Sequence, residues 1–217
     1  MVAVVSGRSA AFLADRLELD RYSSPLRAIG LHGLEEWTPD GALKLRPGVS
    51  AWRPVIETVG VALRAALPQG VRVEDKGYGI TVHWRSVTTS GAELAALAAA
   101  ATDTVQRIGV AHGLLARLGK ASVELAPPLG IDKGVVVKEL CDGLEAAGYM
   151  GDDLGDLLGF QALEQLRNSS VLAAVKVAVS GEEAPRQLLE EADLVLEDPS
   201  AAGRFLEALA ESVRRRR

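Results

Sequence analysis

The sequence has a single cysteine, Cys141, which excludes a disulfide framework within the chain. It also lacks any apolar run of the roughly 18 to 20 residues that a membrane-spanning helix requires. The Ala-rich stretch from Ala92 to Ala101 is too short for this and contains Glu93. No positively charged and then apolar leader opens the sequence. We therefore expect a cytoplasmic protein that does not span a membrane.

Basic residues are also scarce, since the formal net charge is −5 and a basic cluster occurs only at Arg214 to Arg217. Nucleic-acid-binding proteins usually carry a basic stripe, so we expect no nucleic-acid partner. We interpret the four arginines as a solvated helix end, where cations interact favourably with the helix dipole. With 217 residues, of which 48% are hydrophobic, the chain can form one sizeable core or two small ones.

Apolar strands alternate with helices over both ends of the sequence, which predicts an α/β fold with a parallel sheet covered on both faces. The expected strands are Val2 to Val5, Arg27 to Leu34, Ala173 to Val179 and Asp193 to Leu196. The expected helices are Ala10 to Leu19, Pro47 to Leu67, Lys133 to Ala147, Leu157 to Arg167, Pro185 to Glu191, and a last one from Pro199.

The middle of the sequence has a different pattern, typical of an inserted domain. The segments Val71 to Glu74, Ile80 to Arg85 and Ala121 to Leu125 alternate between apolar and polar residues, and Glu93 to Ile108 has helical periodicity. We therefore predict a small antiparallel sheet here. The expected division is a core made of residues 1–69 and 127–217, with an α/β cap made of residues 70–126.

Three carboxylates, those of Asp152, Asp153 and Asp156, lie within five residues of each other in the loop Gly151 to Asp156. Like charges repel, so such a group favours a cation, and Mg²⁺ prefers oxygen ligands. The loop also lies where ligands collect in an open parallel sheet, beyond the carboxyl end of a strand. The alternative interpretation is a helix cap, because acidic residues favour the first turn of a helix.

Two further groups favour an anion. Ser6, Gly7 and Arg8 follow the first strand and offer a hydroxyl and loop amides, although Ser-Gly is also an ordinary turn. Lys133 begins a predicted helix, where a cation is poorly placed for the helix dipole unless it faces an anion. A structural role for Lys133 is an equal alternative.

Alternation in the inserted segment places Thr81, His83 and Arg85 on one face of a strand. Lys120, Ser122 and Glu124 likewise share a face of another strand. Such faces can bind a polar ligand through hydroxyl and charged groups. The alternative, which we favour without further information, is that they are the solvated side of a half-buried sheet.

Taken in order, these segments resemble the trehalose-6-phosphate phosphatase family of the haloacid dehalogenase superfamily. The resemblance covers nearly the whole chain, and its most specific parts are the cap stretch from Val73 to Arg85 and the segment from Glu124 to Gly134. The matching stretches are VVSGR at Val4 to Arg8, GLHGLE at Gly30 to Glu35, VEDKGYGITVHWR at Val73 to Arg85, ELAPPLGIDKG at Glu124 to Gly134, GDDLGD at Gly151 to Asp156, and ADLVLEDP at Ala192 to Pro199.

The resemblance implies a Rossmann-like core with an inserted α/β cap, and Mg²⁺-dependent hydrolysis of trehalose 6-phosphate through an aspartyl-phosphate intermediate. It implies that Ser6 hydrogen-bonds the phosphate, that Lys133 neutralises it, and that Asp152 holds Mg²⁺ with support from Asp153 and Asp156. It further implies that the residues that contact or orient the substrate are Arg8, His32, Lys76, His83, Arg85 and Glu124. A trehalose-6-phosphate synthase is a possible partner.

The sequence departs from the family pattern at several positions. Gly155 and Leu157 replace a Thr and a Glu of the acidic motif, and Leu31 replaces a polar residue before the His-Gly pair. The superfamily's first motif, Asp-x-Asp-Gly-Thr, supplies the nucleophile from a central strand, and these residues do not contain it. We expect that the sequence starts too late or is a fragment, and that as written it is inactive and poorly folded.

Two other functions stay open. One is a non-catalytic module that binds a sugar phosphate or a synthase partner through the cap. The other is a phosphatase for another sugar phosphate, such as a phosphate of sucrose or mannosylglycerate, because cap residues rather than the core set specificity.

Overall fold

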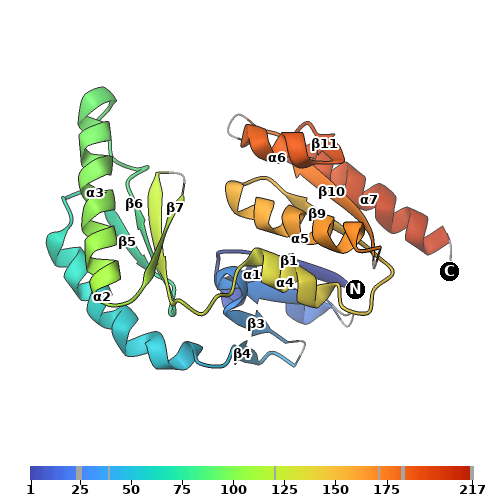
Figure 1. Ribbon diagram of the computed structural model, residues 1–217, viewed down its shortest axis with the longest axis horizontal. Coiled ribbons are helices and arrows are strands. Elements are labelled where there is room, and N and C mark those ends of the chain that lie inside the picture. Colours follow the sequence, from blue (N-terminus) through green and yellow to red (C-terminus); the bar gives the residue numbers. More distant parts are fainter. Residues whose placement is uncertain (23–25, 39, 120, 171, 182–183, 216–217) are drawn as a thin grey trace. The chain divides into compact units, whose positions relative to one another are not determined.

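The computed structural model describes the chain except residues 23–25, 39, 120, 171, 182–183 and 216–217. Lys120 and the last two residues of Arg214 to Arg217 therefore lie outside the described residues. The chain forms two compact units, which we call the N-terminal unit, Met1–Ile131, and the C-terminal unit, Asp132–Arg217. Each is described by itself (Figure 1). The predicted division into core and cap at residues 69 and 127 stays a prediction.

The N-terminal unit contains two sheets. In the first, β1 (Val2–Val5) pairs in parallel with β2 (Leu26–Gly30), and β3 (Glu35–Trp37) and β4 (Leu43–Leu45) continue the sheet antiparallel. Helix α1 (Ala10–Arg16) connects β1 with β2 and buries Leu13 against Ala28. The predicted strand Arg27 to Leu34 is wrong at its end, because Leu31 and His32 adopt positive φ values of 49° and 56° and turn the chain after Gly30.

The second sheet is the antiparallel sheet predicted from the alternating segments, here called the cap sheet. Its strand order is β5-β6-β8-β7, and its elements are β5 (Arg72–Asp75), β6 (Ile80–His83), β7 (Leu115–Gly119) and β8 (Ser122–Ala126). Ile80 and Val82 are fully buried beneath α2 (Arg53–Ala66) and α3 (Gly91–Ala111), whereas Thr81 and His83 belong to the opposite face, as predicted. Figure 1 shows both helices on one side of this sheet.

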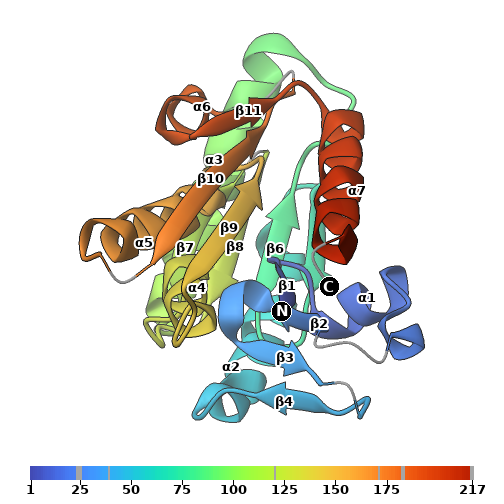
Figure 2. The same cartoon turned by 90° about the vertical axis from the view of Figure 1, so that its right-hand side faces the viewer.

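The C-terminal unit is a three-stranded parallel sheet with order β11-β10-β9 (Figure 2). Its strands are β9 (Ala146–Gly151), β10 (Ala173–Val179) and β11 (Leu194–Leu196). Its helices are α4 (Lys133–Leu140), α5 (Leu157–Asn168), α6 (Arg186–Glu191) and α7 (Pro199–Arg215). The predicted α/β class with parallel strands is therefore confirmed.

The predicted helix Lys133 to Ala147 is wrong in its second half. The helix ends at Leu140, Gly143 adopts a φ of +72°, and Ala146 begins strand β9. Positive φ favours glycine and interrupts helical geometry, so the chain can turn here and enter the sheet. Among the described residues, no helix is both long and apolar enough to cross a bilayer.

Candidate functional site

The loop Ser6 to Arg8 lies at the carboxyl end of β1 and is held by backbone hydrogen bonds to the end of β2 and to the segment that follows it. The Ser6 amide donates to the Ile29 carbonyl at 3.0 Å, and the Arg8 amide donates to the Ser6 hydroxyl at 3.1 Å. His32, in turn, donates its amide to the Ser6 carbonyl at 2.9 Å. The Ser6 hydroxyl oxygen thus accepts a hydrogen bond from its own loop, which leaves its O–H free to donate to a ligand.

His32 packs directly against this loop. A Cβ atom on Gly7 would lie 2.5 Å from His32 Nε2, so glycine is required for the imidazole to lie this close to the backbone. The same nitrogen lies 2.8 Å from Glu124 Oε2, on β8 of the cap sheet. His32 therefore connects the first sheet of the N-terminal unit with its cap sheet.

Lys76, which directly follows β5, also connects the first sheet of the N-terminal unit with the cap sheet. Its ammonium donates to the Gly7 carbonyl at 3.0 Å and to Glu124 Oε1 at 3.4 Å. Burial opposes ionisation of Glu124, but the hydrogen bond and charge of His32 and the charge of Lys76 outweigh it and hold the pKa of Glu124 below its usual value. We call Gly7, His32, Lys76 and Glu124 the Glu124 cluster.

Glu74, on β5, is a member of this region that the sequence analysis missed. Its Oε2 lies 2.9 Å from His83 Nε2, and its Oε1 lies 3.5 Å from an Arg8 guanidinium nitrogen. Burial raises the pKa of Glu74, but His83, Lys76 and Arg72 together lower it below the usual value. Alternation already placed Glu74 opposite to the apolar face, but only the register of β5 with β6 brings it beside His83.

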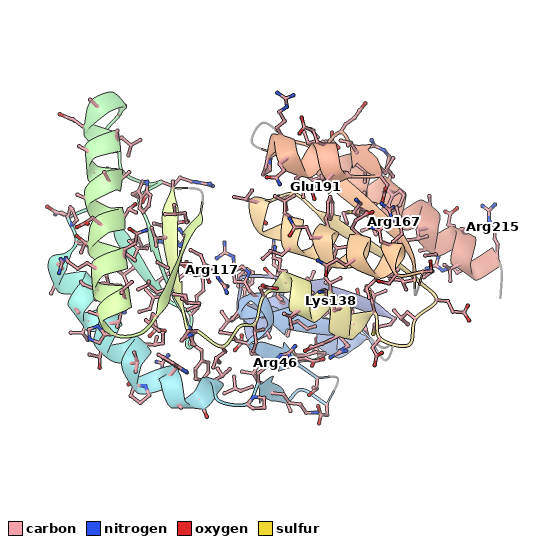
Figure 3. All side chains as sticks on the ribbon, in the orientation of Figure 1. Arg46, Arg117, Lys138, Arg167, Glu191 and Arg215 are labelled. Atoms are coloured by element: carbon pink, nitrogen blue, oxygen red, sulfur yellow. The ribbon has the colours of Figure 1, made fainter. Side chains whose placement is uncertain are left out.

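Arg85 and Arg117 lie in different parts of the cap sheet, Arg85 beyond the end of the inner strand β6 and Arg117 on the edge strand β7. Arg85 is exposed two residues beyond the end of β6 and takes part in none of the ion pairs given above. Arg117, on β7, lies opposite Glu124 in the strand register and donates to the Ile131 carbonyl at 3.2 Å (Figure 3). Of the predicted substrate residues, the structure therefore joins Arg8, His32, Lys76, His83 and Glu124 but not Arg85.

In the C-terminal unit, the acidic loop is organised around the buried carboxylate of Asp156. Its Oδ1 accepts from Lys133 Nζ at 2.7 Å and from the Tyr149 hydroxyl at 2.6 Å. Its Oδ2 accepts from the amides of Asp152 and Asp153 at 3.0 and 3.1 Å. Tyr149 is a further residue that the sequence analysis missed, since it lies on β9, where a helix was expected to have just ended. We call these residues the Asp156 cluster.

Electrostatics in the Asp156 cluster follow from burial and from this pairing. Burial alone would lower the pKa of Lys133, but Asp156 and Asp153 raise it above its usual value. Burial likewise opposes ionisation of Asp156, yet Lys133 and the Tyr149 hydroxyl lower its pKa. The same burial and the Asp156 charge raise the pKa of Tyr149. Lys133 is thus a buried, charged partner of Asp156, which matches the structural alternative as well as the anion-binding one.

The other two carboxylates of the loop, those of Asp153 and Asp152, differ in their contacts within the loop. Asp153 Oδ1 accepts from the Asp156 amide at 3.0 Å, so it caps the short helical turn before α5. Asp152 is exposed, and burial together with Asp153 and Asp156 raises its pKa. Among the described residues, no three His, Cys, Asp or Glu side chains gather into a metal-binding group. The loop fits an ion that keeps most of its waters and takes one or two carboxylates, with Asp152 as the free one.

Comparison with known proteins identifies the family. The sequence model of the trehalose-phosphatase family matches residues 1–192. The chain belongs to this family. Trehalose-phosphate phosphatases of Mycobacterium leprae and Mycobacterium marinum are 29% and 31% identical to it over 96% of its length. The chain spans about half the length of these relatives, 48% and 51% respectively.

Solved structures agree on the fold. The chain is similar to a trehalose-6-phosphate phosphatase related protein, with a TM-score of 0.75, 20% identity and coverage of 99% of this chain and 82% of the other. It is also similar to the C-terminal domain of the Candida albicans trehalose-6-phosphate phosphatase, with a TM-score of 0.71, 18% identity and coverage of 97% and 78%. The predicted haloacid dehalogenase-like fold is therefore confirmed.

Proposed function

We propose that the chain binds trehalose 6-phosphate as part of a phosphatase that hydrolyses this ester to trehalose and phosphate. The observation that carries the proposal is the contact of Lys76 with the Gly7 carbonyl at 3.0 Å. It joins the loop that would hold a phosphate to the sheet that would hold a sugar. The names of the relatives in the family support the same substrate.

Phosphate binding is assigned to Ser6 and Lys133, as the resemblance implies. The Ser6 hydroxyl can donate to a phosphate oxygen because its own lone pair already accepts from the Arg8 amide. Lys133 keeps its proton because Asp156 and Asp153 stabilise the charged form, so it can neutralise an anion at any pH near 7. Phosphoryl transfer depends mainly on such positioning and charge neutralisation.

Sugar binding is assigned to the polar face of the cap sheet. Glu124 is ionised at neutral pH and can accept hydrogen bonds from sugar hydroxyls, while Lys76 and His32 beside it can donate to sugar oxygens. Arg8 and His83 meet at Glu74 and extend the same surface. Arg85 stays a predicted substrate residue, exposed near the end of the strand that carries His83.

Asp152 would hold Mg²⁺, with Asp153 and Asp156 supporting it. The raised pKa of Asp152 supports this assignment, because a carboxylate that its neighbours repel gains most from a cation. Asp156 supports the loop through its two amide contacts rather than as a free ligand. Bound there, Mg²⁺ would supply positive charge to the phosphate oxygens.

The cytoplasmic location expected from the sequence stays a prediction.

The residues of this chain do not include an Asp-x-Asp-Gly-Thr motif, which the resemblance implies as the source of the nucleophile. We therefore expect the chain by itself to bind trehalose 6-phosphate without hydrolysing it. A second candidate is a non-catalytic module that binds the sugar phosphate. A structural neighbour of 14% identity and TM-score 0.64, the C-terminal domain of a Candida albicans trehalose synthase regulatory protein, motivates a synthase as its partner.

The test is a calorimetric titration of the chain with trehalose 6-phosphate, with trehalose and inorganic phosphate as separate ligands, and a phosphate-release assay with Mg²⁺. Lys76→Met should weaken trehalose 6-phosphate binding by about tenfold or more, since hydrogen bonds to charged groups contribute about 1.5–3 kcal/mol. The matched control is Lys44→Met on β4, an exposed lysine outside the Glu124 cluster. It should bind like the wild type.

Each outcome decides one part of the proposal. Binding of trehalose or inorganic phosphate as tight as that of trehalose 6-phosphate would overturn the substrate. Equal losses in Lys76→Met and Lys44→Met would overturn the site. Mg²⁺-dependent phosphate release by the chain alone would contradict the expected lack of turnover and exclude the non-catalytic module.

A further inference from the structure

Thr81 has the one buried side-chain oxygen or nitrogen without a hydrogen-bond partner among the described residues. The residue lies in the middle of β6, and only 4% of its surface is exposed. A buried hydroxyl that makes no hydrogen bond costs free energy, and valine has the same shape without this cost. A threonine in this place therefore calls for a function that valine cannot perform.

The strand register places Thr81 between two carboxylates. Glu74 on β5 is its direct partner on one side, and Glu124 on β8 is its direct partner on the other. Directly opposed residues of antiparallel strands have Cβ atoms about 4.5–5.5 Å apart, so a hydroxyl between two such residues is within reach of either carboxylate after a small rotation. Thr81 thus belongs to the polar face of the cap sheet and lies between the charged groups of Glu74 and Glu124.

Each carboxylate has one oxygen held closely by a histidine, since His32 Nε2 lies 2.8 Å from Glu124 Oε2. His83 and Arg72 both contact Glu74 Oε2, at 2.9 and 3.3 Å. The other Glu124 oxygen, Oε1, is held more weakly, by a 3.4 Å contact with Lys76, which also donates to the Gly7 carbonyl at 3.0 Å. The Lys76 ammonium can therefore turn toward a ligand while it stays anchored on Gly7. Glu124 Oε1 is the oxygen that would then lose its donor.

We propose that Thr81 is a positioning residue that replaces Lys76 on Glu124 when a sugar binds. This inference rests on the proposed function of the same site. When the Lys76 ammonium donates its hydrogen bond to a sugar oxygen, the Thr81 hydroxyl donates to Glu124 Oε1 in its place. One hydrogen-bond donor replaces another, and no proton is transferred. Glu124 then keeps its orientation toward the sugar hydroxyls. The hydroxyl that is unpaired in the free chain is satisfied in the complex, which strengthens binding.

The test uses Thr81→Val and Thr81→Ser in the whole chain, with thermal unfolding and calorimetric titration with trehalose 6-phosphate as the two measurements. Thr81→Val should raise the midpoint of unfolding by about 2–4 °C, because it removes an unsatisfied buried group. It should also weaken binding about fivefold to twentyfold, because the complex loses a hydrogen bond. Thr81→Ser should bind like the wild type. A purely structural role would not move stability and affinity in opposite directions.

Thr38→Val is the matched control. The Thr38 hydroxyl is nearly as buried but donates to the Ala42 carbonyl at 2.9 Å, so its removal should lower the unfolding midpoint and leave binding unchanged. Unchanged affinity or lower stability in Thr81→Val would overturn the role of Thr81 and leave the proposed function intact. If the wild type does not bind trehalose 6-phosphate, the proposed function fails first and this inference fails with it.

Discussion

The Glu124 cluster and the Asp156 cluster each hold one carboxylate beside a lysine, but the chain assembles them in different ways. Partners in the Glu124 cluster are far apart in sequence, with Glu124 92 positions after His32 and Lys76 69 positions after Gly7. In the Asp156 cluster, Tyr149 and Lys133 are only 7 and 23 residues from Asp156. The first cluster is therefore a product of tertiary packing, whereas the second is built largely within one strand-turn-helix segment.

Burial separates the two clusters as well. The side chains of Glu124 and His32 are 16% and 20% exposed, whereas those of Asp156 and Lys133 are 7% and 6% exposed. A ligand can exchange with the partners of a partly exposed carboxylate, but a fully buried pair resists exchange because desolvated charges need each other. The comparison suggests that Glu124 takes part in recognition, while Asp156 holds its loop in place.

The strongest test of this comparison is Asp156→Ala. It leaves the Lys133 ammonium buried without its main partner, so the free energy of unfolding should fall by about 3–5 kcal/mol. Asp152→Ala is the matched control in the same loop. Asp152 is exposed and repelled by its neighbours, so its removal should leave stability unchanged within about 0.5 kcal/mol or raise it slightly. Urea unfolding of the three proteins measures both effects, and equal losses in the two variants would contradict the assignment of Asp156 as the organising residue.

A smaller effect is expected from acid on the Glu124 cluster. The folded-state pKa of Glu124 is below its ordinary value of 4.5, so its contribution is fully present above about pH 4.5 and is lost as the pH falls through the folded-state value. We therefore expect Glu124→Gln to lower the unfolding midpoint at pH 7 and to differ less from the wild type as the pH approaches 3.

Thermal unfolding of both proteins between pH 7 and 3 measures this convergence. Other carboxylates titrate over the same range in both proteins, so the difference between the two curves isolates Glu124. A constant difference at all pH values would mean that the ionised form of Glu124 does not stabilise the fold, and the contrast between its partners and those of Asp156 would lose its electrostatic basis.

The sequence predicts the two clusters unequally well. In the C-terminal unit, adjacent motif residues already indicate that Asp153 and Asp156 act together, because helix caps and short loops are local. What the sequence did not reveal is that Tyr149 joins them. The apolar pattern of Lys133 to Ala147 predicts one continuous helix. In the structure the chain turns at Gly143, and Ala146 and Ala147 belong to strand β9.

For the N-terminal unit, alternation predicted correctly which residues of β6 share the apolar face and which share the polar face. The favoured interpretation of the polar face as solvated is wrong at Thr81, which is also buried. It could not predict their partners, because the register between strands and the order β5-β6-β8-β7 depend on packing over the whole unit. Glu74 was missed for this reason. The sequence analysis also missed strand β7 (Leu115–Gly119) and the short strands β3 and β4.

The smallest expected effect concerns the ion pair of Arg8 with Glu74, on the same polar face as the Glu124 cluster. Arg8 contacts Glu74 at 3.5 Å with its side chain 56% exposed, and it lies over the Phe12 ring with 5.3 Å between guanidinium carbon and ring centroid. Exposed ion pairs contribute about 0–1 kcal/mol, so Arg8→Ala should lower the free energy of unfolding by less than about 1 kcal/mol in a urea titration. A loss above about 2 kcal/mol would mean that this exposed ion pair is held as firmly as the buried partners of Asp156. The two clusters would then differ in how they are assembled but not in how firmly they are held.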